Sequence, residues 1–254
     1  MEIGADAQTA QFWEYDGDVG RRWNLDPKPN SGISEYSVFT NNPFWFKDPF
    51  GDTLIVNNRG DILSNDKKDN VVMVHHFIDN SNHSIGELGK VIDVNEIYKN
   101  LLASHAKEAK SLWNPLTFKN YVTDRGKWDL KLDKNSIFGL GNDGKTKFLF
   151  QGRLMEAQDI GNHHFGVVAK AMGIFPEKFI LMQAGKNQMS KPGDSRPEWQ
   201  KYKVWTETIY IEHGMKSTVT FREMQYPYGD DPQDQGWIQL GFDYYKKNKS
   251  ELLK

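Results

Sequence analysis

Apolar and polar residues alternate with a period of two in several short stretches, which predicts β-strands. Residues 53–56 and 61–63 flank the turn sequence Asn-Asn-Arg-Gly and are typical of a hairpin, and residues 71–78 predict a further strand. Two more alternating stretches, at residues 202–211 and 217–223, flank a second turn. The pattern therefore predicts small antiparallel hairpins or a small sheet.

Three histidines accompany these strands. His75 and His76 are adjacent in the predicted strand and point to opposite faces, so we expect structural roles for both. His83 follows in the polar sequence Asp-Asn-Ser-Asn-His-Ser, which predicts an exposed loop.

Helical spacing of apolar residues predicts four further elements. Asp93 and Glu96 form a capping pattern before a helix of about eighteen residues. A shorter helix is expected at residues 115–122, another begins at Pro176, and the last follows the cap residue Asp231.

Residues 13–52 contain few helix formers and several turn pairs, among them Asp26-Pro27 and Asn42-Pro43. We therefore predict an α+β fold. It is a mainly helical domain with small antiparallel β-hairpins or a small sheet, preceded by an irregular, turn-rich segment.

Residues 156–173, Glu-Ala-Gln-Asp-Ile-Gly-Asn-His-His-Phe-Gly-Val-Val-Ala-Lys-Ala-Met-Gly, concentrate more polar chemistry than a packing helix needs. Asn162 is a good N-cap and Gly173 a good terminator, so the helix is expected to begin at His163. His163 and His164 would then occupy its first turn. Free N–H groups and the positive dipole end favour a bound anion there, and they favour a neutral histidine that can act as a base.

The same stretch supplies most of the candidate site residues. Gly161 and Gly166 would let another backbone or a ligand come close. Adjacent helical side chains diverge by about 100°, so one histidine is expected to be catalytic and the other packed or bound to a carboxylate such as Asp159 or Glu156. We favour His163 as the catalytic one. The candidate catalytic residues are His163, His164, Asp159, Glu156, Asp129 and Lys131, and the candidate substrate-binding residues are Asn162, Gly161, Gly166 and Arg153.

Composition narrows the chemistry. The 254 residues include no cysteine, so neither disulfides nor thiolate metal sites are expected, and no apolar run approaches a membrane span. Residues 99–203 carry eighteen Lys and Arg against ten Asp and Glu, a net charge of +8, whereas residues 1–52 carry four against nine. The charge of the middle region therefore favours a polyanionic partner. We expect no cofactor and no dedicated metal site; a divalent cation would need scattered carboxylates such as Asp129, Glu156 and Asp159.

Three short motifs follow one another near the N-terminus, within residues 13–52. They are Tyr-Asp-Gly, then Gly-Arg-Arg-Trp-Asn-Leu-Asp-Pro, then Tyr-Ser-Val-Phe-Thr-Asn-Asn-Pro-Phe-Trp-Phe-Lys-Asp-Pro-Phe-Gly-Asp. This segment resembles the end of an RHS-repeat-associated core, the shell that encloses the toxin of polymorphic toxins. The resemblance implies a boundary at Asp48-Pro49-Phe50-Gly51. Some relatives cleave themselves there, usually with a large apolar residue next, where this chain has Asp52. Residues 1–52 are accordingly expected to be the shell terminus and residues 53–254 the toxin domain.

Four further motifs follow one another within about residues 85–246. They are Gly-Glu-Leu-Gly, Gly-Lys-Trp-Asp-Leu-Lys, Asp-Ile-Gly-Asn-His-His-Phe-Gly and Tyr-Gly-Asp-Asp-Pro-Gln-Asp-Gln-Gly-Trp-Ile-Gln-Leu-Gly. The chain is similar to the bacterial polymorphic toxin type 44 family over this region. The resemblance implies functional importance for Asp129 and Lys131 and for Asp230, Asp231 and Asp234. In the Asp159–Gly166 motif it implies the same for Asp159, Gly161, Asn162, His163, Phe165 and Gly166.

Together the two resemblances imply an interbacterial toxin module that is secreted or delivered into a target bacterium, although this fragment opens with no signal peptide. Its expected partners are a cognate immunity protein and the RHS shell of the full-length toxin. We expect a hydrolase, with an RNA-cleaving nuclease favoured and Lys131 or Arg153 neutralising developing charge. The alternatives are a peptidoglycan glycosidase that uses Glu156 with Asp159 or Asp129, and a non-catalytic binding or pore-forming toxin.

Overall fold

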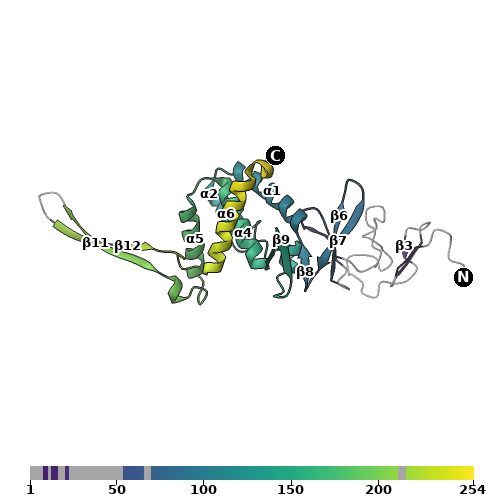
Figure 1. The fold of residues 1–254 in the computed structure, drawn as a ribbon, viewed down its shortest axis with the longest axis horizontal. Coiled ribbons are helices and arrows are strands. Elements are labelled where there is room, and N and C mark those ends of the chain that lie inside the picture. The colour runs from purple at the N-terminus through teal and green to yellow at the C-terminus, as the bar shows by residue number, and fades with distance from the viewer. Residues whose placement is uncertain (1–7, 11–12, 17–20, 23–53, 66–69, 211–215) are drawn as a thin grey trace. The chain divides into compact units, whose positions relative to one another are not determined.

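The computed structural model describes residues 8–10, 13–16, 21–22, 54–65, 70–210 and 216–254 (Figure 1). The chain divides into two compact units. The first, called the sheet unit here, comprises Met1–Leu101 and Asp124–Ala157; the second, the helical unit, comprises Leu102–Thr123 and Gln158–Lys254. Each unit is described by itself.

A seven-stranded mixed sheet forms the sheet unit, with strand order β10-β9-β8-β7-β6-β4-β5. Its pairs are antiparallel except β4 with β6 and β8 with β9, which are parallel. The strands are β4 (Leu54–Val56), β5 (Ile62–Ser64), β6 (Val71–His76), β7 (Ser81–Glu87), β8 (Val91–Asp93), β9 (Lys147–Phe150) and β10 (Arg153–Met155). The predicted hairpin and the strand after it are confirmed.

The predicted loop around His83 is wrong, because His83 lies in strand β7. The turn is complete by Asn80, which adopts a positive φ of 53°, and residues from Ser81 onward pair with β6. Strand β7 is mostly polar because many of its side chains are exposed or only half-buried. Backbone pairing on both sides holds this strand in place, so no alternation of buried apolar residues marks it in the sequence.

Aromatic and aliphatic side chains from the sheet and from two helices make the core of this unit. The helices are α1 (Asn95–Ser111), of which the first part belongs to this unit, and α3 (Ile137–Leu140). The Tyr98 ring contacts Phe138 and Phe150 with centroids 5.4 and 4.8 Å apart. The fully buried residues include Val56, Val72, Val74, Ile92, Tyr98, Ile137, Phe138 and Phe148.

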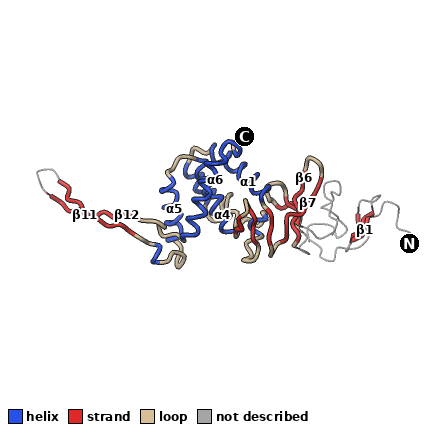
Figure 2. Tube along the Cα trace, viewed as in Figure 1, coloured by secondary structure: helices blue, strands red, loops and turns tan. Residues whose placement is uncertain are grey.

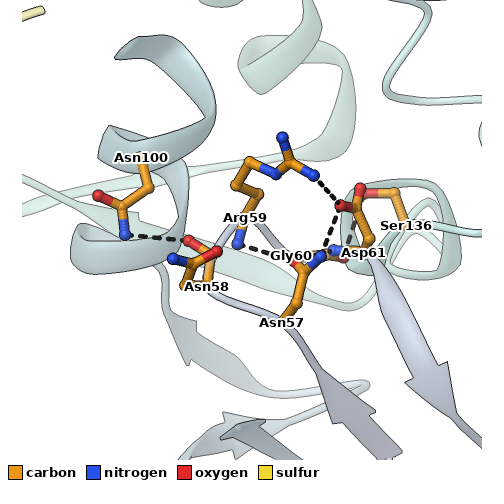
Figure 3. Close-up of polar contacts among 7 residues, drawn as sticks. All are labelled: Asn57, Asn58, Arg59, Gly60, Asp61, Asn100 and Ser136. Carbon is orange, nitrogen blue, oxygen red and sulfur yellow. Dashed lines mark hydrogen bonds and ion pairs between the residues drawn. The ribbon is translucent and has the colours of Figure 1, made fainter. Parts of the chain in front are cut away.

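The Asn-Asn-Arg-Gly turn is held by side chains as well as by backbone (Figure 3). Asn57 Oδ1 accepts hydrogen bonds from the backbone N–H groups of Arg59 and Asp61, at 2.8 and 3.0 Å. Gly60 has φ 84°, a conformation that favours glycine, and its carbonyl accepts from Ile137 N at 2.9 Å. Asn100 Nδ2 donates to the Asn58 carbonyl at 3.0 Å and ties the turn to α1.

The described part of residues 1–53 is a three-stranded antiparallel sheet of β1 (Gln8–Ala10), β2 (Trp13–Asp16) and β3 (Arg21–Arg22). Residues 23–53 lie outside the described residues. They include the expected shell boundary at Asp48-Pro49-Phe50-Gly51 and the expected domain boundary at residue 52.

The helical unit contains α2 (Pro115–Val122), nearly all of α4 (Ala157–Met172), α5 (Glu177–Met189), α6 (Pro232–Leu252) and the end of α1 (Figure 2). Asn114 caps α2 through a bond from Leu116 N, and Asp231 caps α6 through a bond from Gln233 N at 2.8 Å. These starts confirm the predicted helices.

A two-stranded antiparallel ribbon, β11 (Tyr202–Tyr210) and β12 (Lys216–Met224), also belongs to the helical unit. Most of its side chains are exposed. Lys178 of α5 donates to Glu223 at 2.5 Å and ties α5 to β12. The predicted α+β class is confirmed, with a sheet larger than expected and mixed in direction.

Candidate functional site

Helix α4 begins at Ala157, six residues before the expected start at His163. Asn162 is therefore inside the helix and is not its cap. Alanine and glutamine are good helix formers, and Asp159 in the first turn is stabilised by the helix dipole, so the segment before Asn162 is itself helical. The N-terminal end of this helix therefore lies before Asn162 and before both histidines. The expectation that both histidines lie in the first turn, next to a bound anion, is wrong.

The two histidines are instead buried in the middle of α4. His164 is 1% exposed and His163 is 5% exposed. His164 Nε2 forms a 2.8 Å hydrogen bond with Nδ1 of His105, a half-buried residue of α1, and the two rings meet edge to face. This bond joins two imidazoles.

Burial lowers the pKa of His164 well below the usual 6.5, and repulsion from His105 and His163 lowers it further. A charged imidazole would lose its hydration in this position and would face two other imidazoles. His164 is therefore neutral at physiological pH, as was expected of a base, but burial is the main cause and not a helix terminus.

Side chains of α4 contact α6 at two places. Asp159 is 4% exposed, and its Oδ1 accepts a hydrogen bond from Gln233 Nε2 at 3.3 Å. His163, one helical turn further along α4, packs its ring against Tyr244 with centroids 5.4 Å apart. The first contact joins the Asp159–Gly166 motif to the motif that surrounds Asp231, and the second joins it to a later part of α6.

A second buried carboxylate lies beside the N-terminus of α6. Asp230 is 4% exposed and accepts a 2.5 Å hydrogen bond from Gln235 Nε2, which also donates to the Leu181 carbonyl at 3.1 Å. Burial raises the pKa of Asp230 above the usual 3.8, against the opposing effect of the bond from Gln235. The fold thus favours the neutral, proton-carrying form of this carboxyl group more than water does.

The two candidate glycines of α4 have different surroundings. A Cβ on Gly166 would clash with the Ile238 carbonyl oxygen and press on Gly241 of α6. A Cβ on Gly161 would meet nothing within 4 Å. The expected close approach is therefore found at Gly166, where it is made by another helix backbone, and Gly161 has open space beside it.

The remaining candidates belong to the sheet unit. Lys147 donates to Glu156 in an ion pair. Asp129 accepts a hydrogen bond from Arg125 N at 2.7 Å, which closes the turn after α2. Lys131 is half-buried, and Arg153 is exposed on β10.

The ten candidates are thus divided between the units. The helical unit contains six of them: Asp159, Gly161, Asn162, His163, His164 and Gly166. The sheet unit contains the other four: Asp129, Lys131, Arg153 and Glu156. Within the helical unit the structure forms two polar pairs, buried Asp159 with exposed Gln233 and buried His164 with half-buried His105.

Comparison with protein families decides the class of this chain. The family described as bacterial toxin 44 matches residues 117–247, slightly more than half of the sequence. The chain belongs to the bacterial toxin 44 family. No curated protein and no solved structure matches the chain.

All ten candidate residues lie inside the part of the toxin 44 chain that the family matches, whereas His105 lies before it. Sequence reasoning missed His105, which is not among the ten candidates. A signal was present, since His105 follows Leu101 by four residues and Leu102 by three, on the apolar stripe of the helix. An imidazole on a buried stripe needs a polar partner, and His164 supplies it.

Among the described residues, the group of three histidines or carboxylates within reach of one ion is His76, His83 and Glu96, in the sheet unit. It includes none of the carboxylates named above as ligands of a divalent ion. None of the described helices combines the length and the apolar character that crossing a membrane requires.

Proposed function

We propose that this bacterial toxin domain is a hydrolase that cleaves RNA by histidine acid–base chemistry. The observation that carries the proposal is the 2.8 Å hydrogen bond between His105 Nδ1 and His164 Nε2, which pairs a half-buried imidazole with a fully buried one. Such a pair resembles the base-and-orienting-residue arrangement that general base catalysis requires.

The chemical roles follow from burial. In the tautomer in which Nδ1–H of His105 donates to His164, Nε2 of His105 carries the lone pair that accepts a proton from a ribose 2′-hydroxyl. That oxygen then attacks the adjacent phosphate, and the imidazolium returns the proton to the departing 5′-oxygen. His164 serves as a positioning residue, because its lowered pKa keeps it neutral and able to accept the bond from His105. His163 remains the alternative base, although it is less exposed.

RNA is the favoured substrate because residues 99–203 carry a net charge of +8, which attracts a polyanion. We further propose that the domain reaches a target bacterium as the tip of an RHS-type toxin and that a cognate immunity protein neutralises it. A producing cell would otherwise degrade its own RNA.

The full 254-residue chain tests the catalytic proposal in a purified reaction with total bacterial RNA. We expect RNA degradation by the wild type and a loss of about 10²- to 10⁴-fold in the His105→Ala variant. Loss with His163→Ala and retention with His105→Ala would move the base to His163. RNA left intact by a folded wild-type protein would refute the nuclease proposal.

A peptidoglycan glycosidase is the second candidate, favoured by Asp230. A buried carboxyl group with a raised pKa is what a glycosidase uses as general acid. Asp159, in the same unit, is the second carboxylate of this alternative. The same protein preparation is therefore incubated with purified peptidoglycan. Release of glycan fragments that Asp230→Asn or Asp159→Asn abolishes, with RNA intact, would establish this alternative; Glu156→Gln tests the originally expected acid.

A further inference from the structure

We propose that His76, His83 and Glu96 form a binding site for a divalent transition-metal ion of the zinc class. One ligand atom from each residue can be chosen so that all three lie within 4.8 Å of one another. The site belongs to the sheet unit and lies outside the part of the chain that the toxin family matches. It is independent of the proposed RNA cleavage.

Strand register brings the two histidines together. His76 of β6 lies opposite Ser81, and His83 of β7 lies opposite Val74, so both histidines point to the same face of the sheet as diagonal neighbours. Their rings are stacked with centroids 4.8 Å apart, and His76 Nε2 lies 2.8 Å from His83 Nδ1. Glu96, in the first turn of α1, places Oε1 at 3.8 Å from His76 Nδ1.

The chemistry of these donors selects the ion. Imidazole suits zinc, copper and nickel, whereas magnesium and calcium prefer sites made of oxygen ligands. Zinc binds histidine nitrogen and carboxylate oxygen at about 2.0–2.2 Å, so two ligands in a tetrahedral site lie roughly 3.4 Å apart. The three ligand atoms lie within 4.8 Å of one another, so the widest pair must move together by at most about 1.4 Å. His83 and Glu96 are exposed, so rotation of their side chains meets little resistance.

Three protein ligands leave further coordination positions for water or another small ligand. This is the pattern of reactive zinc sites, since purely structural sites are closed by four protein ligands. His76 and Glu96 also line a cavity of about 380 Å³, together with Asn58, Phe77 and Asp79. An ion held by these residues would therefore border a space that admits water.

The alternative is a hydrogen-bonded chain without metal, in which His76 bridges Glu96 and His83. Zinc titration by calorimetry separates the two possibilities, with untagged full-length protein because an affinity tag of histidines binds zinc. We expect one zinc ion per chain at this site, not displaced by a large excess of magnesium. His83→Asn and Glu96→Gln should each weaken that binding by at least about tenfold.

Glu87→Gln is the matched control, because Glu87 is on the same strand as His83 and is paired with Lys90 at a distance of 2.5 Å. It should leave zinc binding unchanged, and circular dichroism confirms that each variant is folded. If the wild type binds no zinc, or binds it equally well in the folded His83→Asn and Glu96→Gln variants, the three side chains form only a hydrogen-bonded chain and the proposal is overturned. Any zinc bound by the helical-unit histidines would persist in both variants and so would not be mistaken for this site.

Discussion

Replacing Gly166 with alanine should destabilise the protein although alanine is the better helix former. A Cβ at this position would meet the Ile238 carbonyl oxygen and the Gly241 Cα, both of them backbone atoms that cannot rotate away. Overpacking of a tight interior contact costs about 1–3 kcal/mol, and contact with backbone on both sides places this site toward the upper end. The gain in helix propensity is roughly 1 kcal/mol. The net loss of unfolding free energy is therefore about 1–2 kcal/mol.

Gly161→Ala provides the matched control in the same helix. Its new Cβ would meet nothing within 4 Å, so only the propensity gain of roughly 1 kcal/mol should remain. The difference between the two variants in unfolding free energy then isolates the cost of the contact between α4 and α6, because the propensity term is common to both.

Urea unfolding followed by circular dichroism measures this difference, and thermal unfolding should show it as a shift of several degrees, since 1 kcal/mol is worth roughly 2–4 °C in a chain of this size. Equal stability of the two variants, within the roughly 0.5 kcal/mol typical of a surface substitution, would refute the reasoning. The contact also matters for the candidate site, because a Cβ on Gly241 would press on the His163 carbonyl. Gly166→Ala should thus reduce any activity that depends on His163 or His164.

Two further predictions concern pH. Because the pKa of Asp230 is raised in the folded state, its contribution to stability is present below about pH 4 and is lost as the pH rises through the raised value. The unfolding free energy of the Asp230→Asn variant should therefore change less between pH 4 and 7 than that of the wild type. Parallel curves for variant and wild type would contradict this. The lowered pKa of His164 gives its stability contribution the opposite dependence on pH. Its contribution is present above about pH 6.5 and is lost as the pH falls below that value, so wild type should lose stability on acidification from pH 7 to 5 and His164→Asn should lose less, as measured by urea unfolding at both pH values.

Local sequence signals predicted many of the elements. Three of them depend on contacts within a few residues and could therefore be predicted from the sequence. They are the helix start at Asp231 and Pro232, the helix at Pro115–Val122 and the turn between β4 and β5. The start of α4 was misplaced because Asn162 resembles a cap, although the residues before it are equally able to continue a helix. A good cap residue inside a helix cannot be distinguished from a true cap by its type alone.

The sequence by itself determined the α+β class, the family and the concentration of chemistry around residues 159–166. Only the tertiary structure decided which of those residues are buried and what they contact. His105 and His164 are 59 residues apart, His76 and Glu96 come from a strand and a helix, and Gly166 meets Gly241 across two helices. Such pairs are set by packing and strand register, in which each element's position depends on all its neighbours, and no local pattern of residues records that position.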